Sequence, residues 1–167
     1  MKKSLIVLLI MVGYLLSACG SNADDSAPAG MAWERIAEAI EQADPESLTL
    51  TIYHFPDSIL TRAPLTVDQL KTHPKTEIAI LRGDELAEIL PALTAKLRAA
   101  QPDPVQVLPW QYARLYYVLE ADGKKLLDVS CADGANGLFV NGTEYEFDKW
   151  FYQLVEPYFP KAAEADA

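Results

Sequence analysis

The residues of this sequence with the most evident chemical potential are its cysteines and histidines. The chain contains two of each, namely Cys19 and Cys131, and His54 and His73. A thiol paired with a histidine base can act as a nucleophile, so Cys131 with His54 is a candidate centre for a small thiol enzyme or hydrolase. Cys131 ends a predicted strand, however, whereas thiols are activated at helix N-termini or beside cations. We therefore expect Cys131 to be buried and inert, and we assign no catalytic residue.

The histidines also lack the spacing of a metal site. His54 and His73 have Asp57 and Asp68 near them in the sequence. No pair of these residues has a recognised ligand spacing such as His-x-x-x-His. We expect an ordinary strand histidine and an ordinary loop histidine, with no metal and no cofactor.

An aromatic-rich strand offers a candidate binding surface. Alternation along residues 112–121 places Leu115, Tyr117 and Leu119 on one side, which is typical of a core. The other side mixes tyrosines with charged residues, and its candidate ligand-binding residues are Tyr112, Arg114 and Tyr116. Packing within the sheet is the commoner role of such residues, because aromatic pairs across strands stabilise sheets.

The elements that position these residues follow from two periodicities. Apolar residues at helical spacing predict a helix around residues 33–43, a short capped helix from Thr66 to His73, a long helix from Gly83 to Leu97 with a kink or a break at Pro91, and a last helix from Asp148. Alternation predicts strands over residues 48–55, 58–62, 77–81, 112–121, 124–131, 138–140 and 143–147.

The order of these elements predicts an α+β fold. Asp122-Gly123 and Asn141-Gly142 are typical of tight hairpin turns, so the last third is expected to be a meander. In its last strand, Tyr145 is expected to face the core and Glu144 to face water. Because no regular β-α-β alternation is present, we expect one antiparallel sheet with the amphipathic helices packed on one face.

The N-terminus is a short export signal. Lys2 and Lys3 precede an apolar run that is too short for a stable membrane span. The sequence Leu16-Ser17-Ala18-Cys19 that follows resembles the lipobox of bacterial lipoproteins. This resemblance implies cleavage before Cys19 and a lipid on that cysteine. It also implies a tethered, exported protein, and Gly20 implies the outer membrane, facing the periplasm, if the host is Gram-negative.

The chain divides accordingly. We predict a signal peptide over residues 1–18, a flexible tether over 19–30, one globular domain over 31–160 and a frayed tail over 161–167. Removal of the signal peptide takes away Lys2 and Lys3. The Lys and Arg count then falls from 14 to 12 against 24 Asp and Glu, which changes the formal net charge from −10 to −12. Such a charge disfavours nucleic-acid binding and would attract a basic partner, but keeping a tethered, exported domain soluble is the commoner role of acidic residues.

Together these features predict a tethered, non-enzymatic module that binds a protein or another envelope component. A specific form is an inhibitor or immunity-type domain whose acidic residues meet a basic exported protein. The alternatives are the thiol enzyme of Cys131 with His54, and a structural envelope-assembly subunit whose sheet edge pairs with a neighbour.

Overall fold

The computed structural model describes residues 29–100, 102–105, 112–131 and 137–160, with side chains from residue 32 onward. The predicted signal peptide, the lipobox and the predicted tail lie outside the described residues. The first described helix begins at Ala29. Ala29 and Gly30, which we predicted to lie in the tether, belong to this helix, and the rest of the predicted tether lies outside the described residues.

A six-stranded antiparallel sheet forms the centre of the molecule, in the order β2-β1-β3-β4-β5-β6. Four α-helices and two short 3-10 helices accompany it in the described part of the chain, so the expected α+β class is confirmed. The strands are β1 (Leu48–His54), β2 (Glu77–Leu81), β3 (Leu115–Ala121), β4 (Lys124–Cys131), β5 (Leu138–Val140) and β6 (Thr143–Tyr145). The helices are α2 (Ala29–Gln42), α3 (Val67–Thr72), α4 (Gly83–Ala99) and α5 (Trp150–Val155), with η1 (Pro45–Ser47) and η2 (Glu156–Tyr158).

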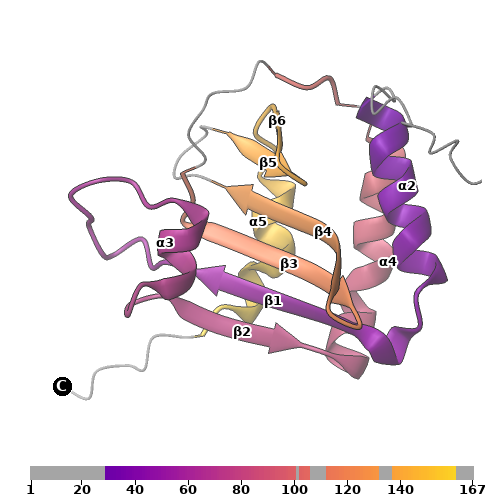
Figure 1. Ribbon diagram of the computed structural model, residues 1–167, viewed down its shortest axis with the longest axis horizontal. Helices are drawn as coiled ribbons and strands as arrows, with labels where there is room; N and C mark the ends of the chain where they lie inside the picture. Colours follow the sequence, from indigo (N-terminus) through magenta and orange to yellow (C-terminus); the bar gives the residue numbers. More distant parts are fainter. Residues whose placement is uncertain (1–28, 101, 106–111, 132–136, 161–167) are drawn as a thin grey trace, which may run out of the picture.

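The helices α2, α4 and α5 pack against one face of the sheet and form the main core (Figure 1). Leu50 from β1, Tyr117 from β3 and Val129 from β4 lie in this core, at most 1% exposed. Leu93 from α4 and Phe151 from α5 meet them from the helical side. The alternation predicted for β1 and β3 is therefore confirmed on this face, because side chains two apart in a strand share a side.

The opposite face of the sheet carries only α3 among the described helices (Figure 1). A smaller core lies beneath α3 and consists of Phe55, Leu70, Ala113, Tyr116 and Val118. The predicted capping box fixes the start of α3, since the Thr66 hydroxyl accepts from the Gln69 N–H and the Gln69 side chain accepts from the Thr66 N–H. Beyond α3 this face has no helix over it in the described part of the chain, and we call it the open face.

The sequence predicted a kink or a break at Pro91, and α4 continues through this residue without a break. A proline at this position leaves the carbonyl of Ala87 without its helical donor. Both Pro91 and Ala87 are exposed, so water can take the place of that donor. The buried stripe of α4, which includes Leu86, Leu93 and Leu97, holds the helix on the sheet through this gap.

Two predicted strands are wrong or too long. Residues 58–62 form turns and not a strand, because Ile59 N–H bonds to the Pro56 carbonyl within the loop. The strand predicted from residue 112 begins at Leu115. The preceding Ala113 donates its N–H to the Leu65 carbonyl and packs in the smaller core, so the alternation does not extend back to it.

The last strand is also shorter than predicted, and its side that carries Glu144 is less exposed to solvent than predicted. β6 ends at Tyr145, and Glu144 is only 8% exposed, whereas we expected it to face water. The chain segment at Pro104 and Val105 explains the low exposure of Glu144. Val105 donates its N–H to the Glu144 carbonyl, and Pro104 bridges to Tyr145, so chain covers this edge of the sheet.

Candidate binding surface

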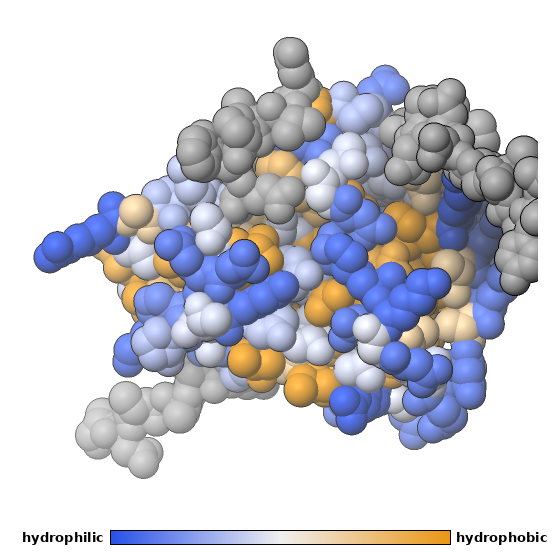
Figure 2. Space-filling view, viewed as in Figure 1, coloured by the Kyte–Doolittle hydropathy of each residue, from blue (hydrophilic) through white to orange (hydrophobic). Residues whose placement is uncertain are grey.

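The open face is hollowed by a groove with a volume of about 640 Å³. Its lining comes from α3 and from strands β1, β3, β4 and β5. Figure 2 shows this face as a mixture of hydrophilic and hydrophobic surface, with hydrophilic residues across its centre. The groove is lined by Thr51, Tyr53, Val67, Asp68, Lys71, Tyr116, Val118, Glu120, Lys125, Asp128, Ser130, Phe139, Asn141 and Gly142.

Two tyrosines from neighbouring strands form its aromatic part. Tyr53 in β1 and Tyr116 in β3 are register partners, and their ring centroids lie 5.9 Å apart. Phe139 from β5 adds a third aromatic side chain to the lining. Aromatic side chains offer a large contact area at a low cost in conformational entropy, which suits a recognition surface.

A polar network fixes Tyr116 in place. Its hydroxyl donates to the Asp128 carboxylate over 3.4 Å, and Lys125 donates to the same carboxylate oxygen over 2.6 Å. Burial, followed by the Asp128 charge and this hydrogen bond, raises the pKa of Tyr116 above the ordinary tyrosine value. The hydroxyl therefore remains a neutral donor throughout the physiological pH range.

The turn after β5 supports the same network. Asn141 adopts a positive φ of 48° in the Asn141-Gly142 turn that the sequence predicts. Its side-chain oxygen accepts from the Asp128 N–H over 2.7 Å, and its amide donates to the Leu126 carbonyl over 3.3 Å. The turn thus holds β4 beside the groove, and the Asn141 side chain stays on its rim.

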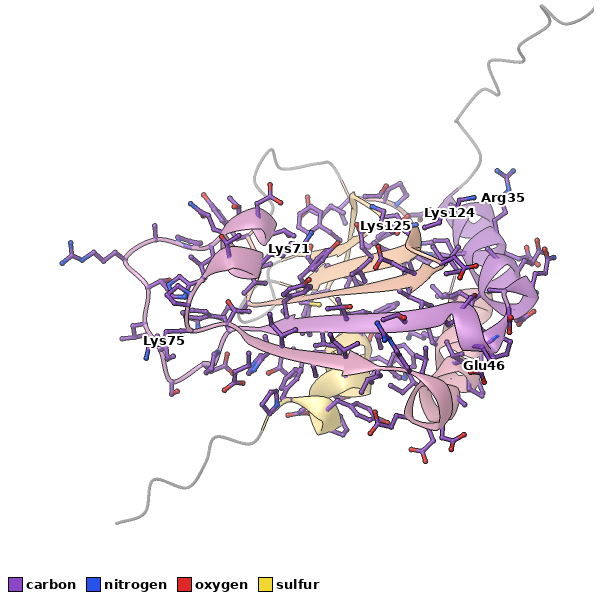
Figure 3. All side chains as sticks on the ribbon, turned by 60° about the horizontal axis from the view of Figure 1, so that its bottom comes forward. Arg35, Glu46, Lys71, Lys75, Lys124 and Lys125 are labelled. Atoms are coloured by element: carbon purple, nitrogen blue, oxygen red, sulfur yellow. The ribbon has the colours of Figure 1, made fainter. Side chains whose placement is uncertain are left out.

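A lysine from α3 completes the groove on its other side. The Lys71 ammonium lies 4.3 Å from the centroid of the Tyr116 ring, within the range of a cation–π interaction. Figure 3 shows Lys71 and Lys125 on the same side of the sheet, one from α3 and the other from the β3–β4 hairpin. The lining also holds Asp68, Glu120 and Asp128, so acidic residues outnumber basic ones in the groove.

The structure separates the three binding residues that the sequence suggested. Tyr116 lies in the groove. Tyr112 is 39% exposed and forms a bridge with Thr66, away from the strand ladder. Arg114 donates to the Pro56 and Ile59 carbonyls over 3.2 and 3.1 Å, and its guanidinium lies 5.5 Å from the Phe55 ring.

The candidate thiol centre is not assembled for nucleophilic attack. Cys131 is 1% exposed in the main core, and burial raises the pKa of its thiol to about 12. His54 and Cys131 are each register partners of Leu115, so a full strand separates them. His54 instead bonds to Glu77 over 3.1 Å and stacks on Phe159 with a centroid separation of 3.9 Å.

The described residues contain neither a cluster of metal-ligating side chains nor a helix that could span a membrane. No group of three or more His, Cys, Asp or Glu is placed to hold a metal ion in the described part of the chain. His73 packs edge-on against Phe55 on the side of the smaller core, whereas His54 is 8% exposed and stacks on Phe159, which packs against the main core. No helix within the described ranges is long and apolar enough to cross a bilayer.

Sequence reasoning missed most of the groove. Tyr53 lies on the side of β1 opposite its apolar stripe, a position that also suits a solvated strand. Lys71 belongs to a short helix whose packing site has no sequence signature. The alternation of Asp128 and Ser130 with Val129 and Cys131 in β4 was a usable signal, because polar residues at alternate positions indicate a sheet face that is not packed in the apolar core.

In comparisons with known proteins, no protein-family model, curated protein or solved structure matches the chain.

Proposed function

We propose that this protein is a lipid-anchored, non-enzymatic binding module of a bacterial envelope, and that the groove on its open face receives a segment of a protein partner. The observation that carries the proposal is the groove itself, a hollow of about 640 Å³ on a sheet face that α3 covers at one end only among the described helices. Because an antiparallel sheet commonly leaves one face to solvent, the support comes from the hollow and its aromatic lining and not from the lack of a second helix layer.

The chemistry of the lining favours a protein segment as the ligand. Tyr53 and Tyr116 supply apolar surface with polar tips, as in many protein recognition sites. Asp68 and Glu120 add negative charge on either side of them. A partner that presents an apolar or aromatic residue next to a lysine or arginine would match this arrangement, and the chain's net charge of −10 would attract it.

The anchorage in this proposal rests on the lipobox at Cys19. The lipid would hold the domain at a membrane surface, and a Gram-negative host would place it on the outer membrane, facing the periplasm. An inhibitor or immunity-type role against a basic exported protein is the specific form of this function. The thiol enzyme has less support, because the Cys131 thiol is buried and a strand separates it from His54.

Site-specific photo-crosslinking in native membranes tests the proposal with the full chain. A photoreactive amino acid replaces Thr51, which is a half-buried residue of the groove lining, or Ala95, which lies exposed on α4. We expect a discrete crosslinked protein from position 51 and none from position 95. Equal crosslinking from both positions, or none from position 51, would refute the groove as the binding surface.

A pair of charge variants then tests the chemistry. Asp68→Asn removes a charge from the groove, and Glu88→Gln removes one from the exposed surface of α4. Both variants change the net charge equally. We expect Asp68→Asn to lower the crosslinking yield from position 51 and Glu88→Gln to leave it unchanged, because only the first charge would face the partner.

A further inference from the structure

We propose that two copies of this protein associate through β2, which pairs antiparallel with the β2 strand of the second copy and joins the two sheets into one. The inference does not depend on the groove or on its partner. Its starting point is the edge position of β2, which pairs with β1 alone among the described strands. An edge strand presents unpaired N–H and C=O groups along its outer side, and these groups can bond to another strand.

The side chains of β2 lack the usual protection of an edge. Glu77–Leu81 contains no proline and no lysine, and no register shift occurs in its pairing with β1. Ile78 and Ile80 are 50% and 54% exposed on the open face. Hydrophobic surface gathers along this edge of the face in Figure 2. Natural sheets usually carry charged residues or bulges at such positions, so the exposed isoleucines leave this edge open to pairing with another strand.

A second copy matches the strand in antiparallel register centred on Ala79. Ile78 then lies opposite Ile80 of the second copy, and the two-fold symmetry repeats this pair. Cross-strand pairs of β-branched residues stabilise antiparallel ladders. Glu77 would lie opposite Leu81, so no like charges would face each other within the strand. The contact is isologous and closes at two copies.

The ends of β2 are complementary in charge. Lys75 lies exposed just before the strand, at the end that Figure 3 shows beside the α3 region. The other end leads through Arg82, which donates to the Thr49 hydroxyl of its own copy, into the first turn of α4, where Asp84 and Glu85 make the end acidic on balance. Antiparallel pairing brings the lysine end of each copy to the acidic end of the other, twice by symmetry. This arrangement argues for a second copy as the occupant of the edge.

Sedimentation of the full chain in density-matched detergent measures the association. We expect a dimer for the natural chain and a loss of association of about tenfold or more for Ile80→Lys, which would bring a lysine against the apolar pair. Leu60→Lys is the matched control, since Leu60 is 90% exposed in the loop before α3 and should leave the dimer intact. Circular dichroism and thermal unfolding establish that both variants are folded.

Two further measurements locate the contact. Lys75→Glu should weaken the dimer by about fivefold, whereas Lys124→Glu, an equal change of charge at the β3–β4 turn, should not. Ala79→Cys should form a disulfide-linked dimer in membranes, because Cα atoms opposite each other in a ladder lie within disulfide range. Leu60→Cys should not form this link. A monomer at all concentrations, equal effects of Ile80→Lys and Leu60→Lys, or a dimer that Ala79→Cys does not link would overturn the proposal.

Discussion

Replacing Arg114 with methionine tests whether this residue supports the fold or binds a ligand, since the sequence suggested binding and the geometry indicates support. Its guanidinium donates to the Pro56 and Ile59 carbonyls and lies over the Phe55 ring. These contacts hold the loop between β1 and α3 against the sheet. Methionine keeps a long apolar stem but removes every donor.

The expected cost follows from those contacts. A hydrogen bond from a charged donor contributes about 1.5 to 3 kcal/mol, so two contribute about 3 to 6 kcal/mol at most. The bonds are part-buried, and water can reach the freed carbonyls, which roughly halves that figure. The ring contact adds about 0.5 kcal/mol. We expect Arg114→Met to lower the free energy of unfolding by about 2 to 3.5 kcal/mol.

Urea unfolding of the full chain in detergent, followed by tryptophan fluorescence, measures this change. Arg35→Met is the control, because Arg35 is exposed on α2 and its loss should cost less than about 0.5 kcal/mol. Hydrogen exchange should accelerate in residues 56–65 of Arg114→Met before it does so elsewhere. A change below about 0.5 kcal/mol, with normal exchange in this loop, would refute the structural role and return Arg114 to the candidate binding residues.

Three shorter predictions concern single residues. Cys131 should resist a thiol reagent at pH 8 in the folded protein and react fully in urea, and rapid reaction of the native protein would contradict the burial. Burial raises the pKa of its thiol from 9.0 to about 12. The contribution of the buried thiol to stability should therefore be lost as the pH rises through that interval. For Asp148, burial pushes the carboxyl pKa up, but hydrogen bonds from Lys96 and the Trp150 N–H outweigh it and lower the pKa. Asp148→Asn should therefore cost about 1 kcal/mol in urea unfolding near pH 7 and progressively less as the pH falls below about 4, whereas a cost that does not change with pH would exclude the charge as its source. Radiolabelled palmitate should be incorporated into the natural chain and not into Cys19→Ala, and equal labelling of both would exclude lipidation at this residue.

Local rules account for the elements that the sequence predicted well. The capping box at Thr66 and the turn at Asp122-Gly123 depend on residues within a few positions of each other. The alternation of β1 and the apolar stripe of α4 are equally local, because each is a period of side-chain burial along one segment. Such features survive in the structure since no distant contact opposes them.

The wrong predictions share a different cause. Ala113 leaves the strand pattern because the Leu65 carbonyl, far away in the sequence, accepts its N–H. Glu144 alternates as predicted, yet it is buried because the segment at Val105 lies along its strand. In each case a long-range contact overrides a local tendency.

The sequence by itself determined the class of the fold, the hairpin turns, the predominance of acidic residues and the prediction of a lipid anchor at Cys19, because each follows from composition or from neighbouring residues. Only the tertiary structure decided that Tyr53, Tyr116, Lys71 and Asp128 share one groove, and that β2 lies at the edge of the sheet. Strand order and the seat of α3 arise from packing between segments far apart in the chain, and a single sequence carries no periodic signal for such packing.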